Sequence, residues 1–242
     1  MNTDQTTTVA GLGAVLGIWA HPDDEAYLMA GTAVLALETG ARVGCVTATA
    51  GESGETADED RWPRRELASI RRTEMRTSLG LLGIDDHEWL QLPDGGLATV
   101  DPARGVELVA TVVERFRPDT IVTFGSEGMT GHPDHVAVGN WAAEAARDLG
   151  GIRVLAATKT RDWYDEYPDV SRAIFPQGSP RTDPADLALQ VTLPDEVLDR
   201  KIAALQSQAS QTSGLIDLMG PDAFRIWNRT EFWVDRRVDD GW

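Results

Sequence analysis

The sequence is poor in cysteine, in basic residues and in long apolar runs. Its single cysteine, Cys45, cannot form a disulfide within the chain, so a reducing compartment is the simplest interpretation. The 22 lysines and arginines are outnumbered by 39 acidic residues, and the net charge of −17 opposes binding to nucleic acid or to an anionic membrane surface. No run of ~18 apolar residues could span a bilayer, and no signal peptide is recognisable. We expect a cytoplasmic protein without a membrane span or a nucleic-acid partner.

Motifs for nucleotide binding and for covalent catalysis are also missing. The glycine-containing stretch at residues 51–55 lacks the lysine that contacts phosphates in a phosphate-binding loop. No Gly-x-Ser-x-Gly sequence is present, and Cys45 lies inside an apolar run that reads as a buried strand. These absences argue against a nucleotide hydrolase and against a serine or cysteine nucleophile.

Apolar runs of strand length alternate with longer segments of helical period. This alternation predicts a Rossmann-like α/β fold, in which helices cover both faces of a mostly parallel sheet. The length and the hydrophobic content of 42% suffice for a single domain, which we place at residues 9–242 after a disordered polar tail at residues 1–8. Strands are expected at residues 14–20, 42–48, 88–92, 120–124 and 152–157.

The C-terminal third has weaker patterns. Residues 162–193 are rich in proline, aspartate and aromatic residues, and they predict irregular structure around the domain. An amphipathic helix is expected at residues 195–210, and a strand at residues 231–234 is expected to close the edge of the sheet.

Three of the four histidines lie in two segments that begin with the same tripeptide. Residues 21–25 read His-Pro-Asp-Asp-Glu and residues 132–135 read His-Pro-Asp-His, and each segment follows a predicted strand. A single His-Pro-Asp is equally well explained as a helix start, because Asp caps helices and Pro suits their first turn. In an open parallel sheet, however, ligands bind beyond the carboxyl ends of the strands, where the strand order reverses. Two copies at two strand ends therefore favour a divalent-metal site.

The spacing within the motifs indicates the metal ligands. His21 and Asp24 are three residues apart on one helical turn, so both side chains can reach one ion. His135 lies on the same helix face as apolar residues and points inward, as a third ligand would. Three protein ligands leave positions open for water and substrate, which is typical of catalytic zinc, although the ligand set also suits Fe²⁺ or another divalent metal.

Three further motif residues are candidates for the chemistry. Asp23 is adjacent to a ligand and is expected to take a proton from an attacking water. His132 is expected to donate to a developing oxyanion or to the leaving group, and Asp134 to orient an imidazole.

Substrate-binding candidates are less specific. Glu52 and Glu55 lie in the loop after the second strand, where a binding loop and a plain acidic turn are equally consistent with the composition. Arg71 and Glu74 interrupt the apolar face of a helix expected at residues 63–82. They could form a buried salt bridge with each other, support the site or contact the substrate, and the sequence leaves these alternatives open. Because each alone would be an uncompensated buried charge, we expect the two to be coupled.

At these residues the sequence resembles the LmbE-like (PIG-L) family of zinc-dependent N-deacetylases. The resemblance rests on the two histidine motifs and extends to residues 51–55, the helix with Arg71 and residues 201–211. It implies a Rossmann-like fold that hydrolyses the acetamide of an N-acetylglucosamine-type conjugate, a small-molecule partner. By motif position it implies that His21, Asp24 and His135 are the zinc ligands and that Asp23 is the general base. It also implies that His132, with Asp134 beside it, stabilises the tetrahedral intermediate.

Two departures from the family pattern leave the substrate open. Thr130 stands where some members have a tyrosine, and Gln208 stands where many have a histidine. The alternatives are an amidase for a larger amide, such as a thiol conjugate, and a metal-dependent sugar-binding protein without turnover. Binding alone does not require Asp23 and His132, so their presence favours an enzyme. A homo-oligomer is compatible with the sequence.

Overall fold

The computed structural model describes residues 9–56, 58–168, 172 and 181–236, so the predicted tail at residues 1–8 lies outside it. A seven-stranded sheet forms its centre, with the strand order β3-β2-β1-β4-β5-β7-β6. The strands are β1 (Val15–Trp19), β2 (Val43–Thr47), β3 (Asp86–Trp89), β4 (Thr120–Phe124), β5 (Arg153–Thr158), β6 (Leu189–Thr192) and β7 (Thr230–Asp235). Strands β1 to β5 are parallel, while β7 is antiparallel to both of its neighbours. The predicted mostly parallel α/β sheet is confirmed.

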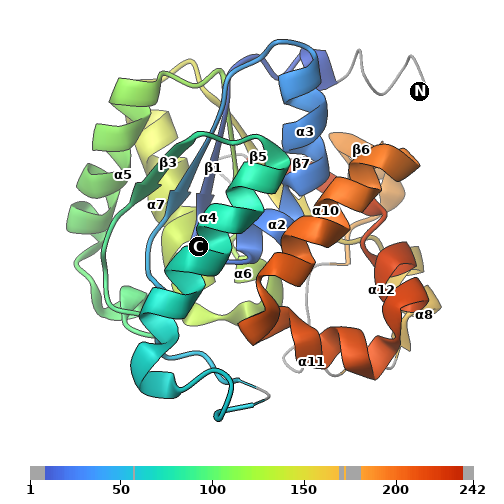
Figure 1. Ribbon diagram of the computed structural model, residues 1–242. Coiled ribbons are helices and arrows are strands. Elements are labelled where there is room, and N and C mark those ends of the chain that lie inside the picture. Colours follow the sequence, from blue (N-terminus) through green and yellow to red (C-terminus); the bar gives the residue numbers. More distant parts are fainter. Residues whose placement is uncertain (1–8, 57, 169–171, 173–180, 237–242) are drawn as a thin grey trace.

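Helices cover both faces of this sheet (Figure 1). The longer ones are α3 (Ala30–Glu38), α4 (Leu67–Leu82), α5 (Pro102–Phe116), α7 (Pro133–Leu149), α10 (Asp195–Ser207) and α11 (Ala209–Met219). The shorter ones are α2 (Asp24–Leu28), α6 (Gly128–Gly131), α8 (Arg161–Glu166) and α12 (Pro221–Trp227). Helices α3, α4 and α10 pack together on one face, and α5 and α7 pack on the other. Of the helices in the described ranges, none has the length and apolar character that a bilayer crossing requires.

The C-terminal third differs from the prediction in two respects. The strand expected at the sheet edge is β7, but it lies between β5 and β6, so that β6 forms the edge. Of the segment 162–193 that was expected to be irregular, residues 169–171 and 173–180 lie outside the described residues, and the rest includes most of α8, a short 3₁₀ turn at Pro184–Asp186 and β6. These elements have three to six residues each, which is too short for a periodic pattern to identify them.

The strand order places the two histidine motifs side by side. Strand β1 pairs with β2 on one side and with β4 on the other, so the order reverses between β1 and β4. The first motif begins two residues after β1, and the second follows β4 after the short helix α6. Both motifs therefore lie at the switch point where parallel α/β sheets bind ligands.

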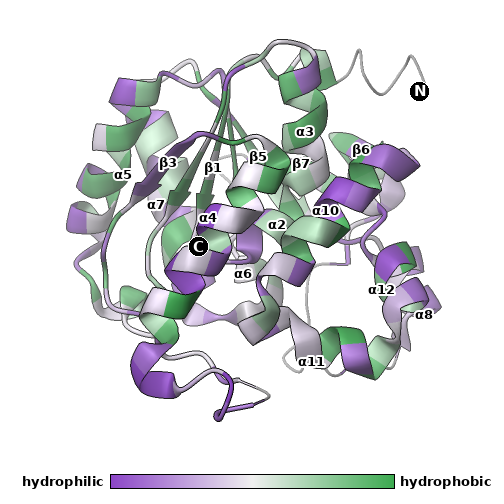
Figure 2. Ribbon diagram, in the orientation of Figure 1, coloured by the Kyte–Doolittle hydropathy of each residue, from purple (hydrophilic) through white to green (hydrophobic). Residues whose placement is uncertain are grey.

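Close packing behind the site fixes the first motif. Figure 2 shows the central strands in the colours of hydrophobic residues, and β1 is buried along its whole length. An added Cβ at Gly17 would lie 2.2 Å from the sulfur of Met29, so only glycine lets the junction of α2 and α3 pack this closely on β1. The Trp19 ring meets Phe124 of β4 edge to face, with centroids 5.0 Å apart.

A buried ion pair joins the sheet to both helical segments beside it. Lys201 donates to Glu231 at 2.7 Å, and both side chains are only 1% exposed. The Glu231 carboxylate also accepts the backbone N–H groups of Gly31 and Thr32 at the start of α3, and Lys201 donates to the carbonyl of Tyr27. Every charge in this cluster is hydrogen-bonded, which is the condition for a stable buried pair.

We expect Lys201→Met to lower the free energy of unfolding by about 3–5 kcal/mol, because it leaves the Glu231 carboxylate buried without its counter-ion. Urea unfolding of metal-loaded protein measures this change. Arg225→Met is the matched control, since Arg225 pairs with Asp199 at the surface and should cost less than about 1 kcal/mol. Equal losses in the two variants would contradict the assigned role of the buried pair.

Candidate metal centre and active site

Three side chains from the two motifs converge on one point. His21 Nδ1 lies 3.1 Å from His135 Nε2 and 3.7 Å from Asp24 Oδ2. Asp24 Oδ1 lies 3.5 Å from His135 Nε2. All three side chains are buried, and they come from the ends of β1 and β4 and the helices that follow. The structure thus brings together the three residues that the sequence indicated as ligands.

Hydrogen bonds behind these rings fix which nitrogen is free. His135 Nδ1 lies 3.0 Å from the carbonyl oxygen of Gly128, which can only accept, so the ring proton belongs on Nδ1 and the lone pair on Nε2. The ring also stacks on Phe124 at 4.1 Å, and burial lowers the pKa of His135 to about 4. A neutral imidazole with a carbonyl behind it is the usual arrangement of a metal-ligating histidine.

His21 is oriented in the same way by carboxylates. Its Nε2 lies 3.0 Å from Asp94 Oδ1 and 3.4 Å from Asp134 Oδ2, so Nε2 carries a proton and Nδ1 faces His135. Burial lowers the pKa of His21, but the hydrogen bonds to Asp134 and Asp94 outweigh it and raise the pKa to about 10. The raised pKa shows that this cluster of carboxylates favours a positive charge at His21.

The donor set fits a divalent metal. His135 Nε2 presents a lone pair to His21 Nδ1 beside the Asp24 carboxylate, so the space between them favours a cation: the proton that the raised pKa places on His21, or a divalent metal that displaces it. Ligands of a tetrahedral zinc at about 2.0–2.1 Å are roughly 3.3–3.4 Å apart. The two ring nitrogens here lie 3.1 Å apart, and the Asp24 carboxylate approaches them through different oxygens, Oδ1 at 3.5 Å from His135 and Oδ2 at 3.7 Å from His21. The ring nitrogens of His21, His132 and His135 also lie within 4.8 Å of one another, so His132 borders the same centre.

Asp94 is a site residue that the sequence reasoning missed. It lies outside both histidine motifs, yet besides contacting His21 it accepts the backbone N–H of Ser53 at 2.7 Å. Burial opposes its charge, but the His21 hydrogen bond and positive charge hold the pKa of Asp94 below its usual value. Its position beyond the carboxyl end of β3 was the available signal.

Asp23 is held beside the centre in a strained conformation. Its φ of 103° is in the region that favours glycine, which costs a non-glycine residue about 1–3 kcal/mol. Its N–H donates to Glu25 Oε2 at 2.9 Å, and Arg71 Nη2 donates to its carboxylate at 3.3 Å. Burial raises the pKa of Asp23 to about 7, against the opposing charge of Arg71. A carboxyl with a pKa near neutrality matches what a general base requires.

The second motif combines a helix cap with a polar group of the site. His132 Nδ1 accepts the backbone N–H of Asp134 at 3.2 Å at the start of α7, and Pro133 follows as the first helical residue. The proton of the neutral ring is therefore on Nε2, where it can be donated. Burial, followed by the charge of His21, lowers the pKa of His132. The Asp134 carboxylate accepts the N–H groups of Gly95 and Leu97, so the imidazole that it orients is His21.

The expected coupling of Arg71 and Glu74 is wrong. Arg71 donates to the carbonyl oxygens of Pro22 and Gly51 and to Asp23. Glu74 instead accepts the N–H and the hydroxyl of Ser210, 2.9 and 2.6 Å away. The two side chains lie one helical turn apart but contact different neighbours, because Arg71 lies against the first motif and Glu74 against the start of α11.

Gln208 and Thr130 have defined contacts at the positions that depart from the family pattern. Gln208 is buried and donates to Glu25 Oε1 at 2.7 Å, so it supports the carboxylate that holds the Asp23 backbone. Thr130 Oγ1 lies 3.2 Å from His135 Nδ1, at the edge of the metal centre.

The structure does not bring the Glu52 and Glu55 carboxylates to the centre. Both residues are exposed, and Glu52 accepts the backbone N–H of Asp94 at 3.0 Å. Glu55 contributes its carbonyl oxygen to Gln211 at 3.3 Å. Neither lines the hollow in which His21 and Asp23 lie.

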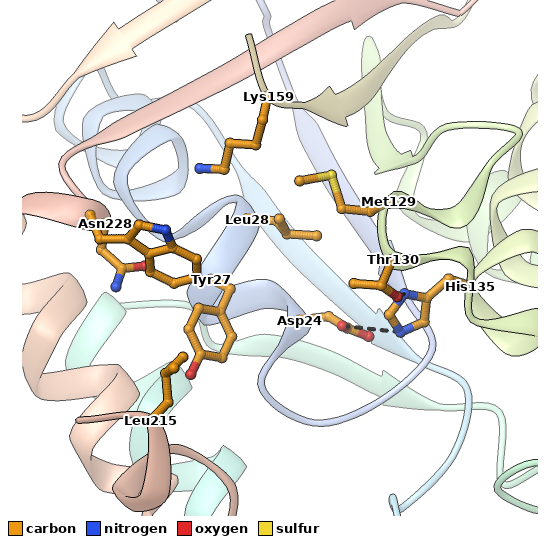
Figure 3. Close-up of a pocket in the computed structure, with 10 residues that line it drawn as sticks. Asp24, Tyr27, Leu28, Met129, Thr130, His135, Lys159, Leu215 and Asn228 are labelled. Carbon is orange, nitrogen blue, oxygen red and sulfur yellow. Dashed lines mark hydrogen bonds and ion pairs between the residues drawn. The ribbon is translucent and has the colours of Figure 1, made fainter. Parts of the chain in front are cut away.

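Two hollows meet at the metal centre. The first is polar and is lined by His21, Asp23, Asp24, Ser53, Gly54, Arg71, Asp94, Gly95, His132, His135 and Gln211. The second is mainly apolar and is lined by Asp24, Tyr27, Leu28, Met129, Thr130, His135, Lys159, Leu215, Trp227 and Asn228 (Figure 3). We call them the polar hollow and the apolar pocket. Asp24 and His135 border both, so a ligand at the centre can reach into either.

Comparisons with known proteins agree with this geometry. A family model described as "PIG-L: GlcNAc-PI de-N-acetylase" matches residues 16–146, more than half of the chain and both histidine motifs. The 1D-myo-inositol 2-acetamido-2-deoxy-alpha-D-glucopyranoside deacetylase of Corynebacterium diphtheriae is 30% identical over 223 residues, covering 81% of this chain and 75% of that protein.

Two other proteins show related sequence and fold. A Bacillus cereus protein named "Probable N-acetyl-alpha-D-glucosaminyl L-malate deacetylase 2" is 28% identical over 209 residues, covering 84% of this chain and 86% of that protein. The crystal structure of N,N'-diacetylchitobiose deacetylase from Pyrococcus horikoshii superposes with a TM-score of 0.67 at 22% identity, covering 97% of this chain and 87% of that chain. At that identity the structural match establishes the fold alone.

The Asp94 contact leads to a testable prediction. We expect Asp94→Asn to weaken zinc binding by about 10–100-fold, because the amide no longer polarises and orients His21 as the carboxylate does. Competition with a fluorescent chelator measures the affinity. Asp86→Asn, at an exposed position of β3, should leave it unchanged. Unaltered zinc affinity in Asp94→Asn would show that Asp94 does not position His21.

Proposed function

Because the chain belongs to the PIG-L family, we propose that it is a metal-dependent hydrolase that removes the N-acyl group of an amino-sugar conjugate. The observation that carries the proposal is the convergence of His21, Asp24 and His135, with Asp23 held beside them. The names of relatives from two bacteria, both deacetylases of N-acetylglucosamine-type conjugates, support this class of substrate.

His21 Nδ1, Asp24 and His135 Nε2 would hold the metal, for which we propose zinc. A divalent metal there would supply a positive charge that polarises the amide carbonyl and lowers the pKa of a water to about 7. The carbonyl behind His135 and the carboxylates behind His21 keep both lone pairs aimed at this point. Ligand geometry of this kind also accommodates Fe²⁺.

Asp23 is proposed as the general base. Its carboxylate takes a proton from the attacking water as the water oxygen bonds to the amide carbon, and later returns that proton to the departing amine nitrogen. Arg71 and Glu25 fix its position from two sides, through the carboxylate and through the backbone N–H. Its positive φ is maintained by these contacts, as is typical of strained residues at functional sites.

His132 is proposed to stabilise the tetrahedral intermediate. Its Nε2–H is free to donate because Nδ1 already accepts the N–H of Asp134. Its lowered pKa keeps the ring neutral at pH 7, so it contributes a hydrogen bond to the oxyanion rather than a full charge. Asp134 acts through His21, as a positioning residue.

The polar hollow is proposed to bind the sugar. Arg71, Asp94, Ser53 and Gln211 present donors and acceptors to this space, and such groups match the hydroxyls of a pyranose ring. Glu52 and Glu55 lie in the exposed loop after β2, at the border of the polar hollow. We propose that they contact only the part of the conjugate that extends out of this hollow, not the sugar ring.

Asp23→Asn separates the base from the ligands. We expect this variant to retain its zinc and to lose kcat by about 10²–10⁴-fold, the usual contribution of a general base. Asp24→Asn should instead purify with much less zinc, because it removes a ligand. Elemental analysis after dialysis measures the metal, and fluorescent detection of released amine measures turnover. A metal-free Asp23→Asn with a metal-loaded Asp24→Asn would reverse the two assignments.

Isotope labelling tests the reaction itself. Incubation of zinc-loaded enzyme with a panel of N-acetylglucosaminides in H₂¹⁸O should place one ¹⁸O in each released acetate and produce one free amine per turnover, because water attacks the amide carbon directly. Mass spectrometry of the acetate provides the measurement, with the Asp23→Asn protein as the control. Acetate without label, or no amine from any member of the panel, would refute the proposed reaction.

A further inference from the structure

A buried cation lines the apolar pocket beside the metal centre. Lys159 follows β5 directly, is 8% exposed, and lies across the pocket from Asp24 and His135 in Figure 3. Neither histidine motif includes Lys159, and the proposed reaction does not use this residue. A lysine is rarely buried unless it has a partner.

The contacts of Lys159 leave most of its hydrogen-bonding capacity unused. Its ammonium lies over the rings of Trp163, Trp227 and Phe232, with Nζ to centroid distances of 4.5, 5.9 and 5.5 Å. Its one hydrogen bond to the part of the chain that the structure describes is a long contact of 3.4 Å to the carbonyl oxygen of Thr230. Among the described residues, no carboxylate lies within ion-pair distance of it, although an ammonium has three protons to donate.

The carboxylate that most favours its charge is already occupied. Glu231 uses Oε1 for Lys201 and Gly31, and Oε2 for both donors of Thr32. Burial, followed by repulsion from Lys201, lowers the pKa of Lys159 to about 7, even with Glu231 nearby. The ammonium thus lies among aromatic rings with one long hydrogen bond and no paired carboxylate among the described residues, which leaves its donors available to an anionic ligand.

The walls of the pocket indicate what accompanies the charge. Leu28, Met129, Leu215 and Trp227 give it a mainly apolar lining, in contrast to the polar hollow on the other side of the centre. A substrate whose reacting amide lies at the centre would place its sugar hydroxyls in the polar hollow. The part that enters the apolar pocket must be apolar where it passes these walls and anionic where it meets Lys159.

We propose that the apolar pocket binds an apolar segment of the substrate that ends in a carboxylate, and that this carboxylate pairs with Lys159. The inference rests on the proposed function and adds a substrate class to it. The carboxylate is carried either by the acyl group or by the aglycone of the amino-sugar conjugate. Lys159 is then a specificity-determining residue for the same reaction.

Matched substrate pairs test this pairing, one pair for each source of the carboxylate. The first pair is 4-carboxyphenyl and 4-carbamoylphenyl N-acetylglucosaminide, and the second is methyl glucosaminide N-acylated with glutarate or with glutaramide. Within a pair only the charge of the terminal group differs. We expect the carboxylate member of at least one pair to have a kcat/KM roughly 10- to 100-fold higher, the range for a hydrogen bond between charged groups.

Lys159→Met keeps the length of the side chain and removes its charge. In this variant the acid-to-amide ratio should fall to within about twofold of one, while turnover of the carboxamide members is retained. Leu215→Ala is the control, since it removes an apolar wall and should weaken both members of a pair alike. Lys159→Gln is the second variant if circular dichroism shows that Lys159→Met does not fold. Equal turnover of acid and amide in the wild type, or an acid preference that survives in Lys159→Met, would overturn the inference.

A binding measurement keeps this test separate from the proposed function. Calorimetric titration of zinc-loaded Asp23→Asn with the same four compounds should show tighter binding of the acid, and the double variant with Lys159→Met should not. If the wild type releases no amine from any member, the proposed function fails, and the calorimetric preference alone decides on Lys159. Equal affinities of acid and amide would overturn the inference even where turnover is observed.

Discussion

The structure depends on a cluster of imidazoles and carboxylates that favours a positive charge, either a proton on His21 or a bound metal. Two imidazole nitrogens from residues 114 positions apart in sequence, His21 and His135, face each other at 3.1 Å, with the Asp24 carboxylate beside them. Each ring is fixed from behind, one by carboxylates and the other by a backbone carbonyl, so His21 Nδ1 and His135 Nε2 stay aimed at one point. Strands β1 and β4 are adjacent, and both motifs lie at the one edge where their ends meet. The fold therefore holds this donor set in place before a metal binds, and because a metal must displace the proton of His21, metal affinity is coupled to pH.

The same edge of the sheet also positions the groups around the donors. Arg71 donates to two backbone carbonyls on separate loops and to the Asp23 carboxylate, so one side chain joins the first motif to the loop after β2. An added Cβ at Gly51 would lie 2.1 Å from Arg71 Nη1, which explains the glycine at this position. Glu25 completes the support through the Asp23 N–H, and Gln208 and Ser78 hydrogen-bond Glu25 in turn. A strained residue persists only where its surroundings determine its conformation this completely.

The sequence was informative where chemistry imposes a fixed spacing, and less so where partners come from distant segments. The repeated His-Pro-Asp and the three-residue spacing of His21 and Asp24 were sufficient to predict which side chains meet. The parallel sheet followed from the alternation of apolar runs. Asp94 was missed because an isolated aspartate in a turn has an adequate local explanation. The pairing of Arg71 with Glu74 was inferred from helical spacing, which gives the face of a helix but not the neighbour that packs on it. The order of β6 and β7 depends on contacts across the sheet that no local pattern encodes.

This division also explains why the motifs leave the substrate undecided. The motif residues form the metal centre and one wall of the polar hollow, whereas the apolar pocket is built largely by residues outside both motifs, from α2, α11 and α12 and the end of β5. Thr130 lies on the border, and because its hydroxyl is within hydrogen-bonding distance of His135, it extends less far toward a substrate than a tyrosine would. The names of two relatives carry different conjugates, inositol in one and malate in the other. We therefore expect the specificity of this chain to depend on the lining of the apolar pocket rather than on the ligand set.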